Sequence, residues 1–139
     1  MFIDASATFA ILNREPGYED LTRRIEDVRD QLFTSPLSRF EAAVSLALQR
    51  SDKTKKPTPA LVSECAELVA AFVNEVNARD IHISSSIGDG AIRAAGQYGK
   101  AVGHEADLNF GDCFTYACAK AFRLKLIYKG NDFARTDLA

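Results

Sequence analysis

The stretch LNFGDCFTYACAK, residues 108–120, reads as the start of a helix, in which a glycine turn leads into a face of small and apolar residues. Asp112 stands where that packed face begins, although a carboxylate is rarely buried without a partner. The same question arises for three other acids: Asp4 in MFIDAS, Glu41 in SRFEAAVSLAL and Asp132 in KGNDFARTDL. Our hypothesis is that the four acids meet.

On either side of this stretch, hydrophobic periodicity and turn residues predict the element order β-α-α-β-α-α-β-α-α-β. The predicted strands are residues 1–3, 31–35, 80–84 and 124–130, and the predicted helices are 7–15 (capped by Ser6), 18–30, 37–50, 58–76, 92–100 (after a capping box of Ser86 and Asp89) and 112–123. Strands that alternate with helices favour a parallel sheet covered on both faces, and ligands of such sheets lie beyond the carboxyl ends of the strands.

Glu41 is the acid whose position is most informative. The expected buried stripe of its helix consists of Leu37, Phe40, Val44, Ala47 and Leu48. Glu41 falls inside this stripe by helical spacing, and an ionised carboxylate removed from water costs several kcal/mol unless it is compensated. Either a metal or an arginine compensates it, or Glu41 leans into solvent near the helix start and favours the helix dipole.

The other three acids also have ordinary structural explanations. Asp4 caps the following helix unless Ser6 does so, Asp112 is an N-cap or first-turn acid, and Asp132 is a turn residue, a role that Asn131 would serve equally well. However, strand C-termini and the following helix N-termini share one edge of a parallel sheet. Carboxylates gathered there raise one another's pKa, and a hard divalent cation that prefers oxygen ligands, Mg²⁺ or Mn²⁺, resolves the repulsion.

Composition limits the alternatives. The chain has 139 residues, which predicts one domain spanning residues 1–139, and its net charge of −2 argues mildly against a large nucleic-acid footprint. Three cysteines without disulfide or metal spacing indicate a reducing, cytoplasmic compartment, and no apolar run approaches the roughly 20 residues of a membrane span. His82, expected in a strand, and His104, expected in a loop, are too far apart to indicate zinc.

The segments MFIDASA, SRFEAA, LNFGDCFTYACAK and LIYKGNDFARTDL together resemble PIN-domain ribonucleases of the VapC toxin type, over essentially the whole chain. This resemblance implies a three-layer α/β/α fold with a central, mostly parallel sheet of about four to five strands. It also implies a Mg²⁺-dependent or Mn²⁺-dependent endoribonuclease acting on structured RNA such as tRNA, neutralised by a VapB-type antitoxin. The implied metal ligands are Asp4, Glu41, Asp112 and, as the fourth acid, Asp132.

The resemblance extends to residues around the acids and to partners. Ser6, Asn131 and Thr136 match supporting positions, and Asp137 is a weaker candidate for such a role. The bases nearest the acids in sequence, expected to contact RNA, are Arg39, Lys129 and Arg135, whereas the basic loop at 53–56 either contributes or is simply solvated. We expect a homodimer, or a hetero-oligomer with antitoxin, formed through an apolar face on residues 21–28 and 46–48. The alternative is a catalytically inactive PIN-like module that binds RNA or protein.

Overall fold

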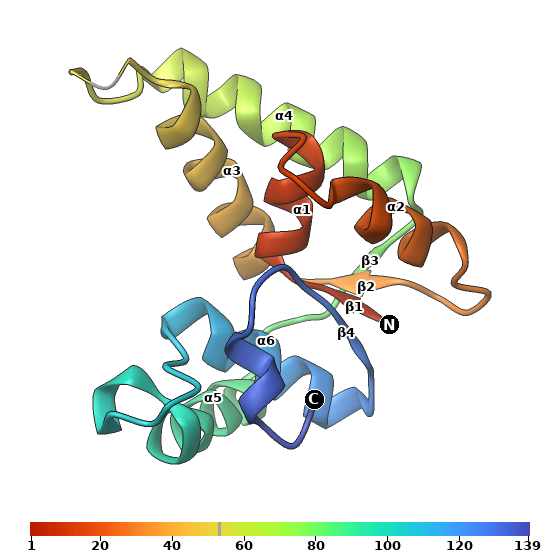
Figure 1. The fold of residues 1–139 in the computed structure, drawn as a ribbon, viewed down its shortest axis with the longest axis vertical. Helices are drawn as coiled ribbons and strands as arrows, with labels where there is room; N and C mark the ends of the chain where they lie inside the picture. The colour runs from red at the N-terminus through yellow and green to blue at the C-terminus, as the bar shows by residue number, and fades with distance from the viewer. Residues whose placement is uncertain (53) are drawn as a thin grey trace.

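The computed structural model describes residues 1–52 and 54–139 (Figure 1). Its strands are β1 (Phe2–Ile3), β2 (Phe33–Thr34), β3 (Arg79–Asp80) and β4 (Leu126–Ile127). Its helices are α1 (Ala5–Leu12), α2 (Tyr18–Glu26), α3 (Pro36–Arg50), α4 (Pro59–Glu75), α5 (Ser85–Tyr98) and α6 (Phe110–Phe122), with 3₁₀ turns η1 (Lys100–Val102) and η2 (Asp132–Arg135). The predicted order of strands and α-helices is confirmed.

The four strands form one parallel sheet in the order β3-β2-β1-β4. Phe2 of β1 is in register with Phe33 of β2 on one side and with Leu126 of β4 on the other. The chain moves outward from β1 through β2 to β3 and then returns to the far side of β1 to form β4. The strand order therefore reverses between β1 and β4, which is where open α/β sheets bind their ligands.

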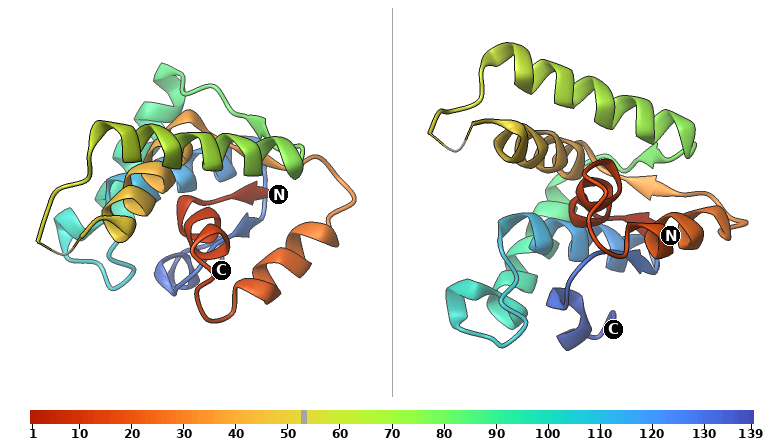
Figure 2. Two further views of the ribbon diagram at one scale, coloured as in Figure 1. Left: turned by 90° about the horizontal axis from the view of Figure 1, so that it is seen from above. Right: turned by 45° about the horizontal axis from the view of Figure 1, so that its top comes forward.

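Alternate strand residues face two separate cores, as the two-residue period of a strand requires. Phe2 and Leu126 face a core shared with α5 and α6, whereas Ile3 and Ile127 face a core shared with α1, α2, α3 and α4. Figure 2 shows the sheet between these two helical layers, with the carboxyl-terminal segment on the α5 and α6 side. The predicted three-layer α/β/α arrangement is confirmed.

At the start of α1 the structure selects one of the two predicted caps, and the predicted start of α5 was wrong. Ser6 lies inside α1, and the cap is Asp4, whose side chain accepts a hydrogen bond from the Ser6 amide. Helix α5 begins at Ser85 and is capped by Ser84, so Ser86 and Asp89 do not form its capping box. In both cases an earlier side chain of the same capping class reaches the free amides first, and a short sequence pattern does not distinguish neighbouring candidates. The cap of α4 by Thr58, with Pro59 in the first turn, is as predicted.

Of the buried stripe predicted for α3, Ala47 is buried as expected and Leu37 and Val44 are partly buried, but Phe40 and Leu48 were wrong. Phe40 and Leu48 are 67% and 53% exposed. The buried face of α3 consists of Ser38, Ala42, Ala43, Leu46 and Ala47. Small side chains allow α3 to approach α1 and α4 closely, and this tight packing outweighs the larger apolar surface of the opposite face.

Smaller corrections concern strand and helix ends. Strand β3 covers Arg79–Asp80, so His82 lies beyond the strand and is exposed. Helix α2 stops at Glu26, and its apolar residues Leu21 and Ile25 are buried against the sheet. They therefore do not supply the exposed dimer face expected from the sequence.

The cysteines are free and buried, and no helix in the described part of the chain is long and apolar enough to cross a bilayer.

Candidate active site

Asp4 follows β1 directly and is held on both carboxylate oxygens. Its Oδ2 accepts hydrogen bonds from the Ser6 amide at 2.9 Å and the Ser6 hydroxyl at 2.5 Å, while Oδ1 accepts one from the Thr115 hydroxyl at 2.7 Å. The residue is only 3% exposed. Asp4 is thus a helix cap whose side chain is also fastened to α6 across the sheet edge, so its capping role and its place in a site are compatible.

Glu41 lies in the second turn of α3 and is half-buried against the start of α6. Its carboxylate packs directly on Gly111, so closely that a β-carbon at position 111 would lie 2.6 Å from the Glu41 Cδ. Burial, together with the negative charges of Asp4 and Asp112, raises the pKa of Glu41 from its ordinary value of 4.5 to about 7. No described residue donates a hydrogen bond to this carboxylate, so none of the donors in the described part of the chain offsets its charge.

Asp112 occupies the third position of α6 and forms a capping box with Asn109. The Asn109 amide donates to Asp112 Oδ2 at 2.9 Å, and the Asp112 amide donates to Asn109 Oδ1 at 3.1 Å. Burial raises the pKa of Asp112 to about 6, against the lowering effect of the Asn109 hydrogen bond and with further upward contributions from Asp4, Asp132 and Asp107. The cap predicted for this residue exists, and it holds one oxygen only.

Asp132 begins η2, just beyond β4, and its side chain is the most exposed of the four acids. Burial raises its pKa, and so do the negative charges of Asp4 and Asp107. Asp4 thereby affects the pKa of each of the other three acids and is the member that they share as a neighbour at the carboxyl-end edge. Asp107 is a fifth acid that the sequence analysis did not single out.

This acid set suits a hard divalent cation in ligand type and in charge. All four side chains offer oxygen. Burial, and to a lesser extent the charges of neighbouring acids, raises the pKa values of three of them, and a bound cation would remove that repulsion. As the side chains stand, however, no three His, Cys, Asp or Glu side chains among the described residues are arranged to hold an ion.

Three polar residues were expected to support the site, and the structure gives them different positions. The Ser6 hydroxyl donates to Asp4 and also accepts a hydrogen bond from the Lys129 amide at 3.0 Å. Asn131 precedes η2 with an exposed side chain that makes no capping bond. Thr136 is buried, and its hydroxyl donates to the Phe133 carbonyl at 2.8 Å. This bond stabilises the end of η2 and does not involve any of the four acids.

Asp137 makes its side-chain hydrogen bonds to α6 and to none of the four acids. It accepts hydrogen bonds from the Tyr116 hydroxyl at 2.8 Å and from Lys120 Nζ at 2.7 Å.

The three bases expected to contact RNA are each engaged by groups of the chain itself. Arg39 pairs with Asp80 at 2.6 Å, Arg135 pairs with Glu105, and Lys129 Nζ donates to the Pro16 carbonyl. Both ion pairs are substantially exposed, so they are worth little and would exchange readily for phosphate contacts. In the predicted basic loop at 53–56, Lys53 lies outside the described residues.

Thr115 is the residue that the sequence analysis missed. It is 1% exposed and donates to Asp4 from the second turn of α6. The sequence could have indicated Thr115 by its spacing, because Thr115 follows Asp112 by three residues and so shares a helix face with it. His104, by contrast, is occupied locally, since its Nδ1 accepts from the Ala106 amide and its ring packs edge-on against Tyr98.

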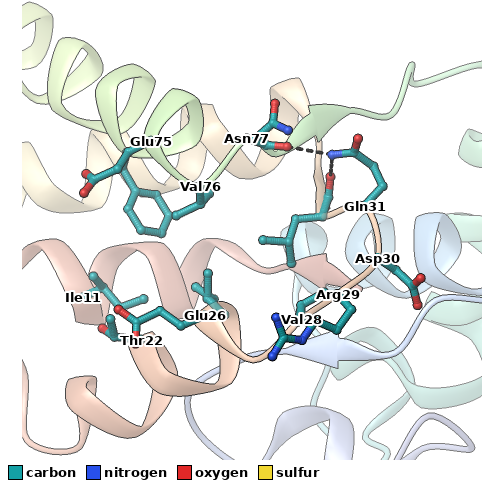
Figure 3. Close-up of a pocket in the computed structure, with 13 residues that line it drawn as sticks. Ile11, Thr22, Glu26, Val28, Arg29, Asp30, Gln31, Glu75, Val76 and Asn77 are labelled. Atoms are coloured by element: carbon teal, nitrogen blue, oxygen red, sulfur yellow. Dashed lines mark hydrogen bonds between the residues drawn. The ribbon is translucent and has the colours of Figure 1, made fainter.

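A pocket of about 650 Å³ lies at the opposite edge of the sheet, near the amino ends of β2 and β3 (Figure 3). It contains none of the four acids. Its polar groups are partly satisfied within the chain, since Gln31 Nε2 donates to the Leu32 and Asn77 carbonyls. Concavity alone would therefore point to a different part of the molecule from the one that the acids define.

The parallel sheet with its reversal beside β1, and the acids gathered at that point, define a PIN-type fold. The family model described as PIN domain matches residues 1–138, and the chain belongs to this family. Within it, the chain is similar to a VapC ribonuclease of Rhizobium meliloti (48% identity, covering 99% of this chain and 98% of the relative). It is also similar to ribonuclease VapC28 of Mycobacterium tuberculosis (37% identity; 98% and 93%) and to ribonuclease VapC30 of the same species (32%; 100% and 96%).

Proposed function

We propose that this protein is an endoribonuclease toxin that depends on a divalent cation, Mg²⁺ or Mn²⁺, and hydrolyses phosphodiester bonds in structured RNA such as tRNA. The observation that carries the proposal is that Glu41, Asp112 and Asp132 have raised pKa values, caused first by burial and in part by the negative charge of Asp4. Groups arranged at such a cost to their charged form are typical of a site that binds a cation. The similarity to VapC ribonucleases supports the same activity.

Asp4, Glu41 and Asp112 would hold the cation, and Asp132 would complete the set. When bound, the cation lowers the pKa of water and polarises the phosphate. Ser6 and Thr115 keep Asp4 in one orientation, so that its oxygens need not reorganise during the reaction. Asp132 is the acid most open to solvent, and its carboxylate takes the proton from the attacking water.

An antitoxin of the VapB type would cover this edge and neutralise the activity. Phe40 precedes Glu41 and Phe110 precedes Gly111 in the chain, and their rings, at 67% and 71% exposure, offer apolar surface to a partner chain. Apolar patches of this kind are typical of interfaces. We also propose assembly as a homodimer or as a hetero-oligomer with the antitoxin.

The decisive experiment compares purified wild type with Asp112→Asn on total RNA, with Mg²⁺ and with EDTA. Wild type should cut RNA only with the cation, and the variant should lose at least about a thousandfold in rate, since a metal ligand is removed while the fold is kept. A matched control is Asp20→Asn, which breaks the exposed ion pair with Arg23 on α2 and should leave the rate unchanged.

Mn²⁺ binding, measured by titration calorimetry, separates this function from the alternative of a non-catalytic module that binds RNA or protein. That module would bind its partner with no cation-dependent cleavage. Near-normal turnover by Asp112→Asn would contradict the assignment of the site.

A further inference from the structure

The carboxyl-terminal segment that carries Asp132 is fastened at both ends. At its start, the Lys129 amide donates to Ser6 Oγ, the same hydroxyl that holds Asp4. In the middle, Phe133 is 1% exposed and packs edge-on against Tyr128 with ring centroids 5.1 Å apart. At its end, Asp137 reaches α6. The segment therefore runs from Ser6, which holds Asp4, to α6, which carries Asp112.

The contact at the end of the segment has unusually good partners for the surface of a protein. Asp137 Oδ1 accepts from the Tyr116 hydroxyl at 2.8 Å, and Oδ2 accepts from Lys120 Nζ at 2.7 Å. Both carboxylate oxygens are thus satisfied by α6. The hydrogen bonds from Lys120 and Tyr116 lower the pKa of Asp137, and burial raises the pKa of the Tyr116 hydroxyl, whose hydrogen bond to Asp137 adds to the rise. The Lys120–Asp137 pair is about half exposed and adds little by itself. The bond from the hydroxyl of the buried Tyr116 to the Asp137 carboxylate is charge-assisted and is the stronger part of the contact.

Helix α6 connects this contact to the acids. Tyr116 follows Asp112 by four residues and Lys120 follows Tyr116 by four, so the three share one face of the helix. The same helix donates from Thr115 to Asp4 and packs against Glu41 at Gly111. Asp4 and Glu41 therefore contact α6 directly, and Asp112 lies on it. Asp132 is linked to α6 only through the segment that ends at Asp137.

We propose that Tyr116, Lys120 and Asp137 form a clamp that sets the position of Asp132 relative to the other three carboxylates, so that these residues are positioning residues for RNA cleavage. The inference rests on the proposed function. The clamp is remote from the reacting atoms and acts by holding η2 in one conformation. The Asp132 carboxylate then already faces the cation site and loses less conformational entropy when the cation binds. Groups that orient ligands in this way strongly influence metal affinity.

The test uses Tyr116→Phe, which removes one hydroxyl and keeps the ring that packs on Tyr98, together with Asp137→Asn. Each should weaken Mn²⁺ binding and lower kcat about fivefold, with KM for RNA within about twofold, as expected for the loss of roughly one hydrogen bond to a charged group. The double variant should be no worse than Asp137→Asn, because both changes break one contact. Asp20→Asn serves as the control on α2.

Epistasis with Asp132 separates positioning from general stability. In an Asp132→Asn background, Tyr116→Phe should have no further effect on Mn²⁺ affinity or kcat, since the clamp acts through Asp132. Hydrogen exchange at the Thr136 and Leu138 amides, which are bonded within the segment, should quicken in either single variant. If Tyr116→Phe does not fold, Lys120→Met, at a half-exposed position, takes its place.

Two outcomes would overturn the inference: Mn²⁺ affinity and kcat unchanged in both single variants, or equal losses with and without Asp132. Either result, obtained with a wild-type protein that binds Mn²⁺ and cuts RNA, would leave the proposed function standing. Wild-type protein that neither binds Mn²⁺ nor cuts RNA would instead overturn the function and the inference with it.

Discussion

The two edges of the parallel sheet differ in what their polar groups have to satisfy them. At the amino-end edge, the pocket of Figure 3 is lined by groups such as Gln31, whose side-chain amide finds two carbonyls within the chain. At the carboxyl-end edge, Glu41 receives no hydrogen bond from any described residue, and its charged form is disfavoured by Asp4 and Asp112. The amino-end edge has the concave shape of a binding site. The carboxyl-end edge has the uncompensated negative charge that is typical of a cation-binding site.

This difference shows which physical quantity locates function in this fold. A hollow forms wherever helix ends and loops fail to fill space, and it costs little. Several partly buried carboxylates that repel one another cost stability, and proteins keep such arrangements where chemistry requires them. The acids, and not the pocket at the amino-end edge, are therefore the feature to perturb.

The largest effect among the remaining tests is expected for Gly111→Ala. The added methyl group would overlap the Glu41 carboxylate, which is the far end of a flexible side chain and can turn away at little cost to the fold. Glu41 would be pushed out of the cluster, and we expect cleavage to fall about a hundredfold, comparable to the loss of an orienting contact at a metal site. Initial rates on a short RNA with saturating Mg²⁺ measure this.

The matched control is Gly96→Ala in the exposed part of α5, where an added methyl group meets nothing within 4 Å. It should keep full activity and gain up to about 1 kcal/mol in stability from its better helix propensity. Full activity of Gly111→Ala would mean that Glu41 does not need its present position, and the carboxyl-end edge would lose one of its four acids.

The parts of this site that could be predicted from the sequence are those determined by topology or by the spacing of neighbouring residues. The acids at strand ends were selected as candidates because a parallel sheet brings strand ends to one edge, a consequence of topology alone. Asp4 was predicted as one of two candidate helix caps, and it is the cap. The Thr115 hydroxyl that also donates a hydrogen bond to Asp4 comes from 111 residues away. A contact of that range cannot be derived from the neighbouring sequence.

Helix α3 shows the opposite failure. Hydrophobicity placed Phe40 and Leu48 in the core, but the alanine and serine face is buried because close approach of α1 and α4 requires small side chains. Glu41 was thus expected near the core for the wrong reason. It is half-buried because Gly111 lets α6 come close, and that fit between two helices becomes visible only when both are placed.

A second test concerns pH and sharpens the difference between the edges. The pKa of Glu41 is raised to about 7 and that of Asp112 to about 6, so the folded state holds these protons more tightly than the unfolded chain does. The stability this provides is fully present below the unfolded pKa values of 4.5 and 3.8 and is lost as the pH rises through 6 and 7. Metal-free protein should lose on the order of 1–2 kcal/mol over this range, allowing for solvent screening.

Urea unfolding at pH 5 and pH 8 in EDTA measures this loss. The Glu41→Gln variant should show a flatter dependence because its amide carries no charge, and adding Mn²⁺ at pH 8 should stabilise wild type more than the variant. Metal-free wild type that is more stable at pH 8 than at pH 5 would show that these carboxylates are not mutually strained.

The smallest effect is expected for two arginines, one at each edge. Arg39 pairs with Asp80 at the carboxyl end of β3, whereas Arg29 lines the amino-edge pocket. If RNA crosses the carboxyl-end edge, Arg39→Gln should raise KM about threefold and reduce the salt dependence of binding by about one counterion, because one phosphate contact is lost. The effect is small because Arg39 must first leave Asp80. Arg29→Gln should leave KM and its salt dependence unchanged, and equal effects of the two substitutions would mean that RNA does not distinguish the edges.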